Sequence, residues 1–150
     1  MASAFHATGK FTLVEIVQFP EKEQERLVIM IVDDEPAILA VLTEFLSDCG
    51  FVPLSAQSGD DARDLILSGM RVDLVFSDVR MPGSLDGYGL ARWVIAHRPE
   101  IPIILVSGDL GKANAATELC GVEMFPKPYE FQAAARKITE TINLHRQRRA

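Results

Sequence analysis

The sequence has few of the residues that cross-link small secreted domains or bind soft metals. Of its 150 residues, two are cysteines and three are histidines. Cys49 and Cys120 stand alone, without a CxxC spacing, which predicts buried thiols in a reducing compartment and no disulfide. His6, His97 and His145 are scattered along the chain, which argues against a zinc site.

Long apolar runs and an excess of positive charge are also missing. No apolar run approaches the roughly 18 residues of a membrane span, and Met1–Lys10 lacks the apolar region and cleavage site of a secretory signal. The net charge of −6 disfavours a nucleic-acid surface. We interpret the basic stretch 145–149 as a solvated helix end, where cations complement the helix dipole. These absences lead us to expect a cytoplasmic protein with neither a membrane nor a nucleic-acid partner.

What the sequence does have is a regular alternation of short apolar runs and segments with helical spacing. The runs are Leu27–Val32, Val52–Ala56, Val72–Ser77, Ile101–Val106 and Val122–Phe125. The helical segments are Pro36–Asp48, Ser58–Ser68, Asp86–His97, Lys112–Leu119 and Tyr129–Arg146. This pattern predicts an α/β domain of the doubly wound (βα)5 type with a parallel sheet. We assign residues 27–146 to this domain, 1–26 to an N-terminal extension (an extra strand or a disordered arm) and 147–150 to a basic C-terminal tail.

Two prolines predict the order of the strands. Pro53 lies in the second apolar run and Pro126 follows the fifth. Because proline has no N–H to donate to a neighbouring strand, both runs should lie at the edges of the sheet. The flavodoxin-like order 2-1-3-4-5 satisfies this condition. It also makes strands 1 and 3 neighbours at the switch point where such sheets bind ligands.

Polar residues follow four of the five apolar runs: Asp33 and Asp34, Asp78, Ser107 and Lys127. In a parallel sheet these groups meet at one edge, where three close carboxylates repel and raise one another's pKa. A divalent cation removes that cost, and oxygen ligands select Mg2+ or a related ion such as Mn2+. Lys127 and Ser107 would balance phosphoryl oxygens while Asp78 attacks in line, forming an acyl phosphate.

Each of these residues also has a simpler interpretation when taken alone. Asp33 and Asp34 precede Pro36 and could cap a helix, as could Asp86 before its own helical segment. Lys127 could be an ordinary surface charge. The coincidence of all these groups at four strand ends favours the phosphoryl site.

With these residues the chain resembles the receiver domain of bacterial two-component response regulators, of the chemotaxis-regulator, single-domain type. The resemblance covers roughly Leu27 to His145. The matching segments are Val32-Asp33-Asp34-Glu35-Pro36, Ser77-Asp78-Val79-Arg80-Met81-Pro82, Asp86-Gly87, Ser107-Gly108 and Lys127-Pro128.

The resemblance implies a role for each matched residue. Asp78 is the phosphoacceptor, Ser107 the switch hydroxyl, and Lys127 the phosphate partner that precedes a cis proline, Pro128. Mg2+ is implied on Asp34, Asp78 and the backbone carbonyl of Arg80, with Asp33 acting through water. The implied partners are a sensor histidine kinase or a histidine phosphotransfer protein and an unknown downstream protein. The implied chemistry is self-catalysed phosphotransfer and dephosphorylation, with no other enzymatic activity.

The chain departs from the family pattern in two places near the site. Gly83-Ser84-Leu85 makes the loop from Met-Pro to Asp-Gly one residue longer than usual. Met124 holds the position of the usual switch aromatic, three residues before the lysine. Two interpretations of this methionine are open: it moves in the switch in place of the aromatic ring, or it is a static core residue.

Two other functions are compatible with the acid set. A Mg2+-dependent phosphohydrolase generally needs an acid two positions after its nucleophile, and Arg80 stands there instead. A receiver-like scaffold that is never phosphorylated would not need the intact acids.

Overall fold

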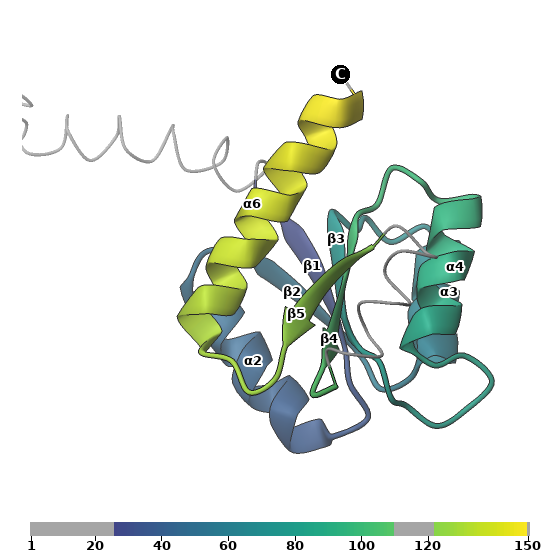
Figure 1. Ribbon diagram of the computed structural model, residues 1–150, viewed down its shortest axis with the longest axis horizontal. Coiled ribbons are helices and arrows are strands. Elements are labelled where there is room, and N and C mark those ends of the chain that lie inside the picture. Colours follow the sequence, from purple (N-terminus) through teal and green to yellow (C-terminus); the bar gives the residue numbers. More distant parts are fainter. Residues whose placement is uncertain (1–25, 110–121, 150) are drawn as a thin grey trace, which may run out of the picture.

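The computed structural model describes residues 26–109 and 122–149. Five parallel strands form one sheet in the order β2-β1-β3-β4-β5, as predicted (Figure 1). The strands are β1 (Val28–Val32), β2 (Val52–Ala56), β3 (Leu74–Asp78), β4 (Ile103–Ser107) and β5 (Glu123–Pro126).

Helices cover both faces of the sheet. They are α2 (Pro36–Asp48), α3 (Gly59–Leu67), α4 (Gly87–His97) and α6 (Phe131–Arg149). Helices α2 and α6 pack on one face, and α3 and α4 on the other (Figure 1). The helix expected at Lys112–Leu119 lies outside the described residues, as do residues 1–25 of the expected N-terminal extension. Helix α6 continues to Arg149, so residues 147–149, which we expected as a separate tail, form its last turn.

Local signals set the starts of the helices. Pro36 occupies the first turn of α2, where its missing N–H costs no helical hydrogen bond. The Ser58 hydroxyl accepts a hydrogen bond from the N–H of Asp61 at 3.0 Å, which caps α3. Asp86 caps α4 by accepting from the N–H of Gly89 at 2.8 Å, so its capping interpretation is confirmed.

The edge strands are those that carry the prolines. Pro53 lies in β2 and Pro126 ends β5, the two outer strands. The central strands β3 and β4 are buried on both faces, which is why their sequences are nearly continuous apolar runs. Among the described residues, no helix has the length and apolar character needed to cross a membrane.

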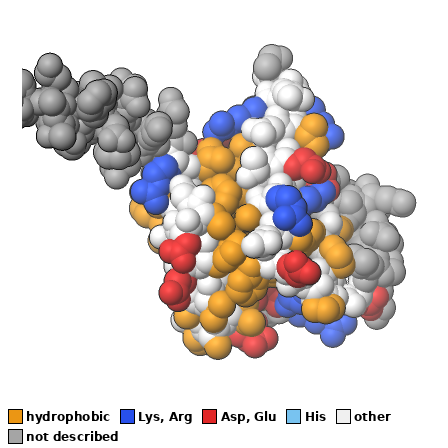
Figure 2. Space-filling model, turned by 90° about the vertical axis from the view of Figure 1, so that its left-hand side faces the viewer, with side chains coloured by type: hydrophobic (Ala, Val, Ile, Leu, Met, Phe, Trp, Pro, Cys, Tyr) orange, Lys and Arg blue, Asp and Glu red, His pale blue; other side chains and the backbone are white. Residues whose placement is uncertain are grey.

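The face formed by α2 and α6 carries a band of apolar side chains between charged ones (Figure 2). A shallow groove on this face is lined by Phe51, Ala135 and Leu144, together with Cys49. The prediction that Cys49 is buried is wrong. It is the C-cap residue of α2 and is exposed, because it stands past the last turn of the helix, in the short connection to β2.

Candidate functional site

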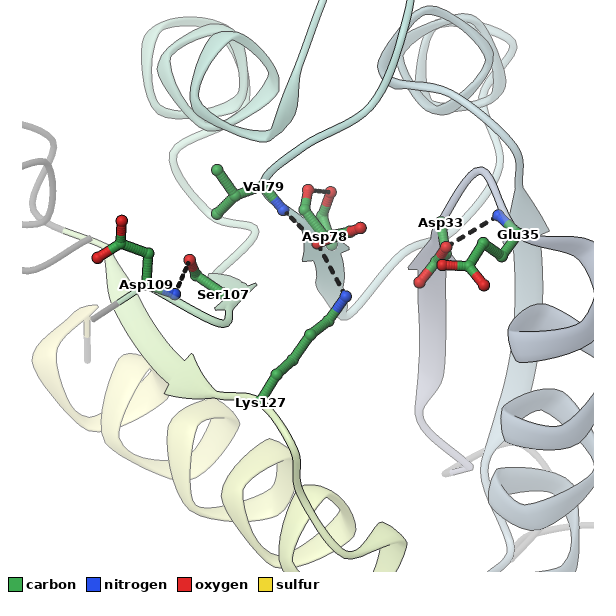
Figure 3. Close-up of polar contacts among 8 residues, drawn as sticks. Asp33, Glu35, Asp78, Val79, Ser107, Asp109 and Lys127 are labelled. Carbon is green, nitrogen blue, oxygen red and sulfur yellow. Dashed lines mark hydrogen bonds and ion pairs between the residues drawn. The ribbon is translucent and has the colours of Figure 1, made fainter. Parts of the chain in front are cut away.

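The predicted polar groups meet at the carboxyl edge of the sheet. Asp33 and Asp34 follow β1, Asp78 ends β3, Ser107 ends β4 and Lys127 follows β5. Asp78, Ser107 and Lys127 line one pocket of about 370 Å³; the other lining residues are Val79, Arg80, Gly108 and Asp109. Figure 3 shows these groups converging from different strands. The parallel sheet thus brings together residues that are up to 94 positions apart, from Asp33 to Lys127.

The Asp78 carboxylate is held by two donors (Figure 3). Its Oδ1 accepts a hydrogen bond from the Lys127 ammonium at 3.1 Å and another from the N–H of Val79 at 2.9 Å. The side chain of Asp78 is 12% exposed and that of Lys127 is 35% exposed. The carboxylate is therefore fixed in orientation while the lysine remains in contact with solvent.

Asp33 is a carboxyl group in an unfavourable place for negative charge. It is 6% exposed, and its Oδ1 accepts a hydrogen bond from the N–H of Glu35 at 2.9 Å. Burial raises the pKa of Asp33 above the ordinary value of 3.8, and the charges of Asp78 and Asp34 raise it further. The hydrogen bond from Glu35 and the charge of Lys127 lower that pKa only in part.

A divalent cation suits this acid set. One carboxylate oxygen each from Asp33, Asp34 and Asp78 lies within 4.8 Å of the others, with Asp33 buried and Asp34 exposed. The donors are all oxygen, which is the preference of Mg2+. The raised pKa of Asp33 shows that its negative charge is unfavourable at this place, and a bound cation would offset that unfavourable charge. The residues present therefore fit the metal site expected from the sequence.

Ser107 also lines the pocket, and a backbone hydrogen bond connects it to Lys127. The Ser107 hydroxyl is buried and accepts a hydrogen bond from the N–H of Asp109 at 3.0 Å (Figure 3). The N–H of Lys127 donates to the carbonyl of Ser107 at 2.9 Å, which ties the end of β5 to that of β4. The Lys127–Pro128 peptide bond is cis, in agreement with the resemblance.

Met124 lies in β5, which is separated from the phosphoacceptor strand β3 by β4, and it stands opposite Leu105 of β4. Its side chain is partly buried and packs against the core cluster under α3 and α4. Phe125, the next residue, packs on the other face of the sheet, within a cluster of rings that includes Phe76 and Tyr129. Met124 is thus the β5 side chain of this pair that faces the α3–α4 layer.

Tyr129 is a neighbour of the site that the sequence argument missed. Its ring meets Phe76 edge-on, with centroids 5.8 Å apart. Burial raises the pKa of the Tyr129 phenol to about 12, and the charges of Asp33 and Asp78 contribute to the rise. Its position directly after Lys127-Pro128 was the available signal, but an aromatic residue there is equally consistent with ordinary core packing.

Comparison with known proteins identifies the family. The family model described as "Response regulator receiver domain" matches residues 29–139, which is most of the chain. The chain therefore belongs to the receiver-domain family of two-component response regulators. Receiver domains are signalling phosphoacceptor domains that histidine kinases phosphorylate, and they bind Mg2+ at an acidic pocket.

The curated relatives are longer proteins. The chain is 30% identical over 121 residues to the DNA-binding transcriptional regulator NtrC of Klebsiella pneumoniae; the match covers 79% of the chain and 25% of NtrC. It is 32% identical over 125 residues to the nitrogen assimilation regulatory protein NtrX of Azorhizobium caulinodans, covering 79% of the chain and 27% of NtrX. The chain thus spans about a quarter of the length of these relatives.

Solved receiver domains share the fold. A response regulator receiver domain protein from Clostridium thermocellum superposes with a TM-score of 0.72 at 27% identity, covering 81% of this chain and 98% of that one. A response regulator receiver protein from Sinorhizobium medicae superposes with a TM-score of 0.73 at 26% identity, with the same coverage. The flavodoxin-like arrangement of the sheet is therefore that of known receiver domains.

Proposed function

We propose that this chain is a single-domain response regulator that accepts a phosphoryl group on Asp78 in a Mg2+-dependent reaction. The donor is a sensor histidine kinase or a histidine phosphotransfer protein. The observation that carries the proposal is the Asp78 carboxylate, fixed by Lys127 and Val79 beside two further acids. Output is by protein–protein contact with a downstream target, or the domain acts as a sink for phosphate.

The proposed transfer is a displacement at phosphorus. A carboxylate oxygen of Asp78 forms the new O–P bond while the N–P bond of the donor phosphohistidine breaks, and the imidazole nitrogen keeps the electron pair. The Lys127 ammonium, which pairs with Asp78 at rest, and the Ser107 hydroxyl then balance the charge of the phosphoryl oxygens. Asp34, Asp78 and the backbone carbonyl of Arg80 would hold Mg2+, with Asp33 acting through water and Mn2+ as an alternative ion. When bound, the ion supplies positive charge that offsets the approach of an anionic donor to these carboxylates.

The same proposal covers partners and location. A net charge of −6 argues against direct contact with nucleic acid, so we place the output on a protein target. We also place the protein in the cytoplasm, where a sensor kinase presents its phosphohistidine.

The test of the phosphoacceptor is mass spectrometry after incubation with acetyl phosphate and Mg2+. The parent chain should gain one labile phosphoryl group, and Asp78→Asn should gain none, because the amide cannot form the acyl phosphate. Asp48→Asn, a change of an acid at the far end of α2, is the matched control and should be labelled like the parent. Undiminished labelling of Asp78→Asn would overturn the assignment.

We further infer that Ser107 and Met124 carry the switch. Phosphorylation adds about −1.5 to −2 charge at the site, which draws the Ser107 hydroxyl toward the phosphoryl group. Met124 is flexible enough to fill the space left behind. Amide chemical shifts with and without beryllofluoride and Mg2+ should therefore change along β5 around Met124. Shifts confined to the loop after Asp78 would contradict this route.

A further inference from the structure

The loop between the phosphoacceptor strand and α4 is fastened to the start of α3 by one carboxylate. Asp60 Oδ1 accepts a hydrogen bond from the Ser84 hydroxyl at 2.5 Å, and Asp60 Oδ2 accepts one from the N–H of Ser84 at 3.1 Å. Asp60 is the second residue of α3 and Ser84 lies 24 positions further along the chain. Ser84 belongs to the stretch Gly83-Ser84-Leu85, the part of the loop that makes it longer than the usual receiver loop.

Two glycines allow this close approach. Gly83 has a φ of +105°, and a Cβ added there would lie 2.9 Å from Asp60 Oδ2. A Cβ added to Gly59 would lie 2.5 Å from the carbonyl oxygen of Leu85. Real Cβ atoms do not approach other atoms so closely. A side chain at position 59 would therefore push the loop backbone away from α3, and one at position 83 would displace the Asp60 carboxylate in addition to straining the backbone. The contact is therefore built into both segments that form it.

The charge at this contact is also balanced. The Arg63 guanidinium lies 3.7 Å from Asp60 Oδ1. Hydrogen bonding from the Ser84 hydroxyl is the largest of the effects that hold the pKa of Asp60 below its ordinary value of 3.8. Asp60 is therefore ionised at neutral pH and accepts both hydrogen bonds as a carboxylate, which makes them stronger than bonds between neutral groups.

The other end of the loop is fixed at the phosphoacceptor. Val79 and Met81 are buried, and between them Arg80 lines the pocket with Asp78 and Lys127. The N–H of Gly87 donates to the carbonyl of Val79 at 2.8 Å, which closes the base of the loop. Arg80 thus lies in a stretch of chain that is held at both ends, by the Gly87–Val79 hydrogen bond at the base of the loop and by the Asp60–Ser84 contact at its apex.

We propose that the Asp60–Ser84 contact is a latch that positions the Arg80 backbone for the divalent cation, so that Asp60 is a positioning residue of the phosphoryl-transfer site. The inference rests on the proposed function, because it assigns the Arg80 carbonyl to Mg2+. Mg2+ demands near-ideal octahedral geometry, and a loop that is ordered before the ion arrives loses less conformational entropy when it binds. Without the latch, the ordering of the loop opposes ion binding.

The expected effect is a loss of Mg2+ affinity with the fold intact. Removal of groups that orient a metal ligand typically weakens metal binding by about 10–100-fold. The latch acts through the backbone rather than on a ligand side chain, so we expect about 3–10-fold for Asp60→Ala, which removes both acceptors. Ser84→Ala removes the hydroxyl and keeps the N–H, and should lose less. Ser84→Thr retains the hydroxyl and should keep most of the Mg2+ affinity of the parent.

The experiment is calorimetric titration of the full chain with Mg2+, with urea unfolding of each variant to show that it is folded. Asp61→Ala is the matched control, because it removes the neighbouring exposed acid of the same helical turn. The cap at Ser58 accepts from the backbone N–H of residue 61, which alanine keeps. Hydrogen exchange of the Ser84 amide, measured without Mg2+, reports the latch directly and should speed up in Asp60→Ala but not in Asp61→Ala.

The outcomes separate the two proposals. If the parent binds Mg2+ and Asp60→Ala binds it no more weakly than Asp61→Ala, the latch is overturned and the proposed function stands. If Asp60→Ala is weakened and Ser84→Thr behaves like the parent, the latch is supported. If the parent binds no Mg2+ and gains no phosphoryl group, the proposed function fails and the latch fails with it.

Discussion

Replacement of Lys127 by methionine should slow phosphorylation of Asp78 and at the same time tighten Mg2+ binding. The two effects have opposite signs because the lysine plays two roles. In the resting protein its ammonium lies 3.1 Å from Asp78 Oδ1. During transfer it balances charge on the phosphoryl group. Methionine keeps most of the length of the side chain and removes the charge together with the N–H donors that reach Asp78.

The size of each effect follows from the geometry. Two unit charges 3.1 Å apart attract by about 5 kcal/mol at an effective dielectric constant of about 20. Solvent screening offsets most of this attraction, because the Lys127 side chain is 35% exposed. Loss of one preorganised donor at developing charge typically slows a reaction about 10²–10³-fold. Because the lysine also stabilises the resting carboxylate, we expect the lower end, about 10²-fold.

The effect on the ion comes from the charge of the site. Three carboxylates and one ammonium face one another in the parent, and the variant leaves the three carboxylates without that positive charge. A site that is more negative by one unit attracts a dication more strongly. We expect Mg2+ affinity to rise about 3–10-fold, which corresponds to about 0.7–1.4 kcal/mol of binding free energy.

The assay pairs calorimetry with the rate of labelling by acetyl phosphate at saturating Mg2+. Lys137→Met is the matched control. The Lys137 ammonium pairs with Glu123 Oε2 at the same 3.1 Å, and its side chain is 24% exposed, but the pair joins α6 to the start of β5. The control should label at the parent rate. Equal labelling rates in the two variants, or weaker Mg2+ binding by Lys127→Met, would refute the roles given to Lys127.

Two further changes test the electrostatics and the packing of the site. Without Mg2+, Asp33→Asn should stabilise the fold at pH 7, because burial raises the pKa of Asp33. Folding then favours the protonated acid, so the parent loses stability as pH rises from 3.8 through the folded-state pKa, and the advantage of the variant should vanish at lower pH. Urea unfolding at several pH values measures this difference, and a variant less stable than the parent at pH 7 would contradict the reasoning. Gly87→Ala should destabilise by about 1–3 kcal/mol, because its Cβ would collide with the carbonyl oxygen of Asp78 and lie 2.7 Å from the Cα of Val79. Among the residues that the structure describes, no atom lies within 4 Å of the Cβ that Gly108→Ala would add, so this variant should change stability by less than about 0.5 kcal/mol. Equal denaturation midpoints for the two glycine variants would count against this account.

The sequence alone determined the sheet and most of the candidate site, because the signals involved are local. Apolar runs of strand length alternating with helical spacing indicate βα units, and Pro53 and Pro126 cannot lie in central strands. In a parallel sheet every strand ends at the same edge. The residue type after each run was therefore enough to predict that Asp78 and Lys127 meet there.

Tertiary structure decided what depends on packing between distant segments. Asp33 and Asp34 are adjacent and chemically identical, yet one is buried and the other exposed. At this point of the chain the N–H of Asp33 donates to the carbonyl of Ala56 and holds the residue beside β2. The Asp60–Ser84 contact joins the first turn of α3 to the loop between β3 and α4, two segments that no periodicity relates. Cys49 is exposed although thiols are usually buried. Periodicity encodes which face of an element is apolar. It does not encode which loops touch once those faces have packed, because that depends on the three-dimensional fit of segments far apart in the chain.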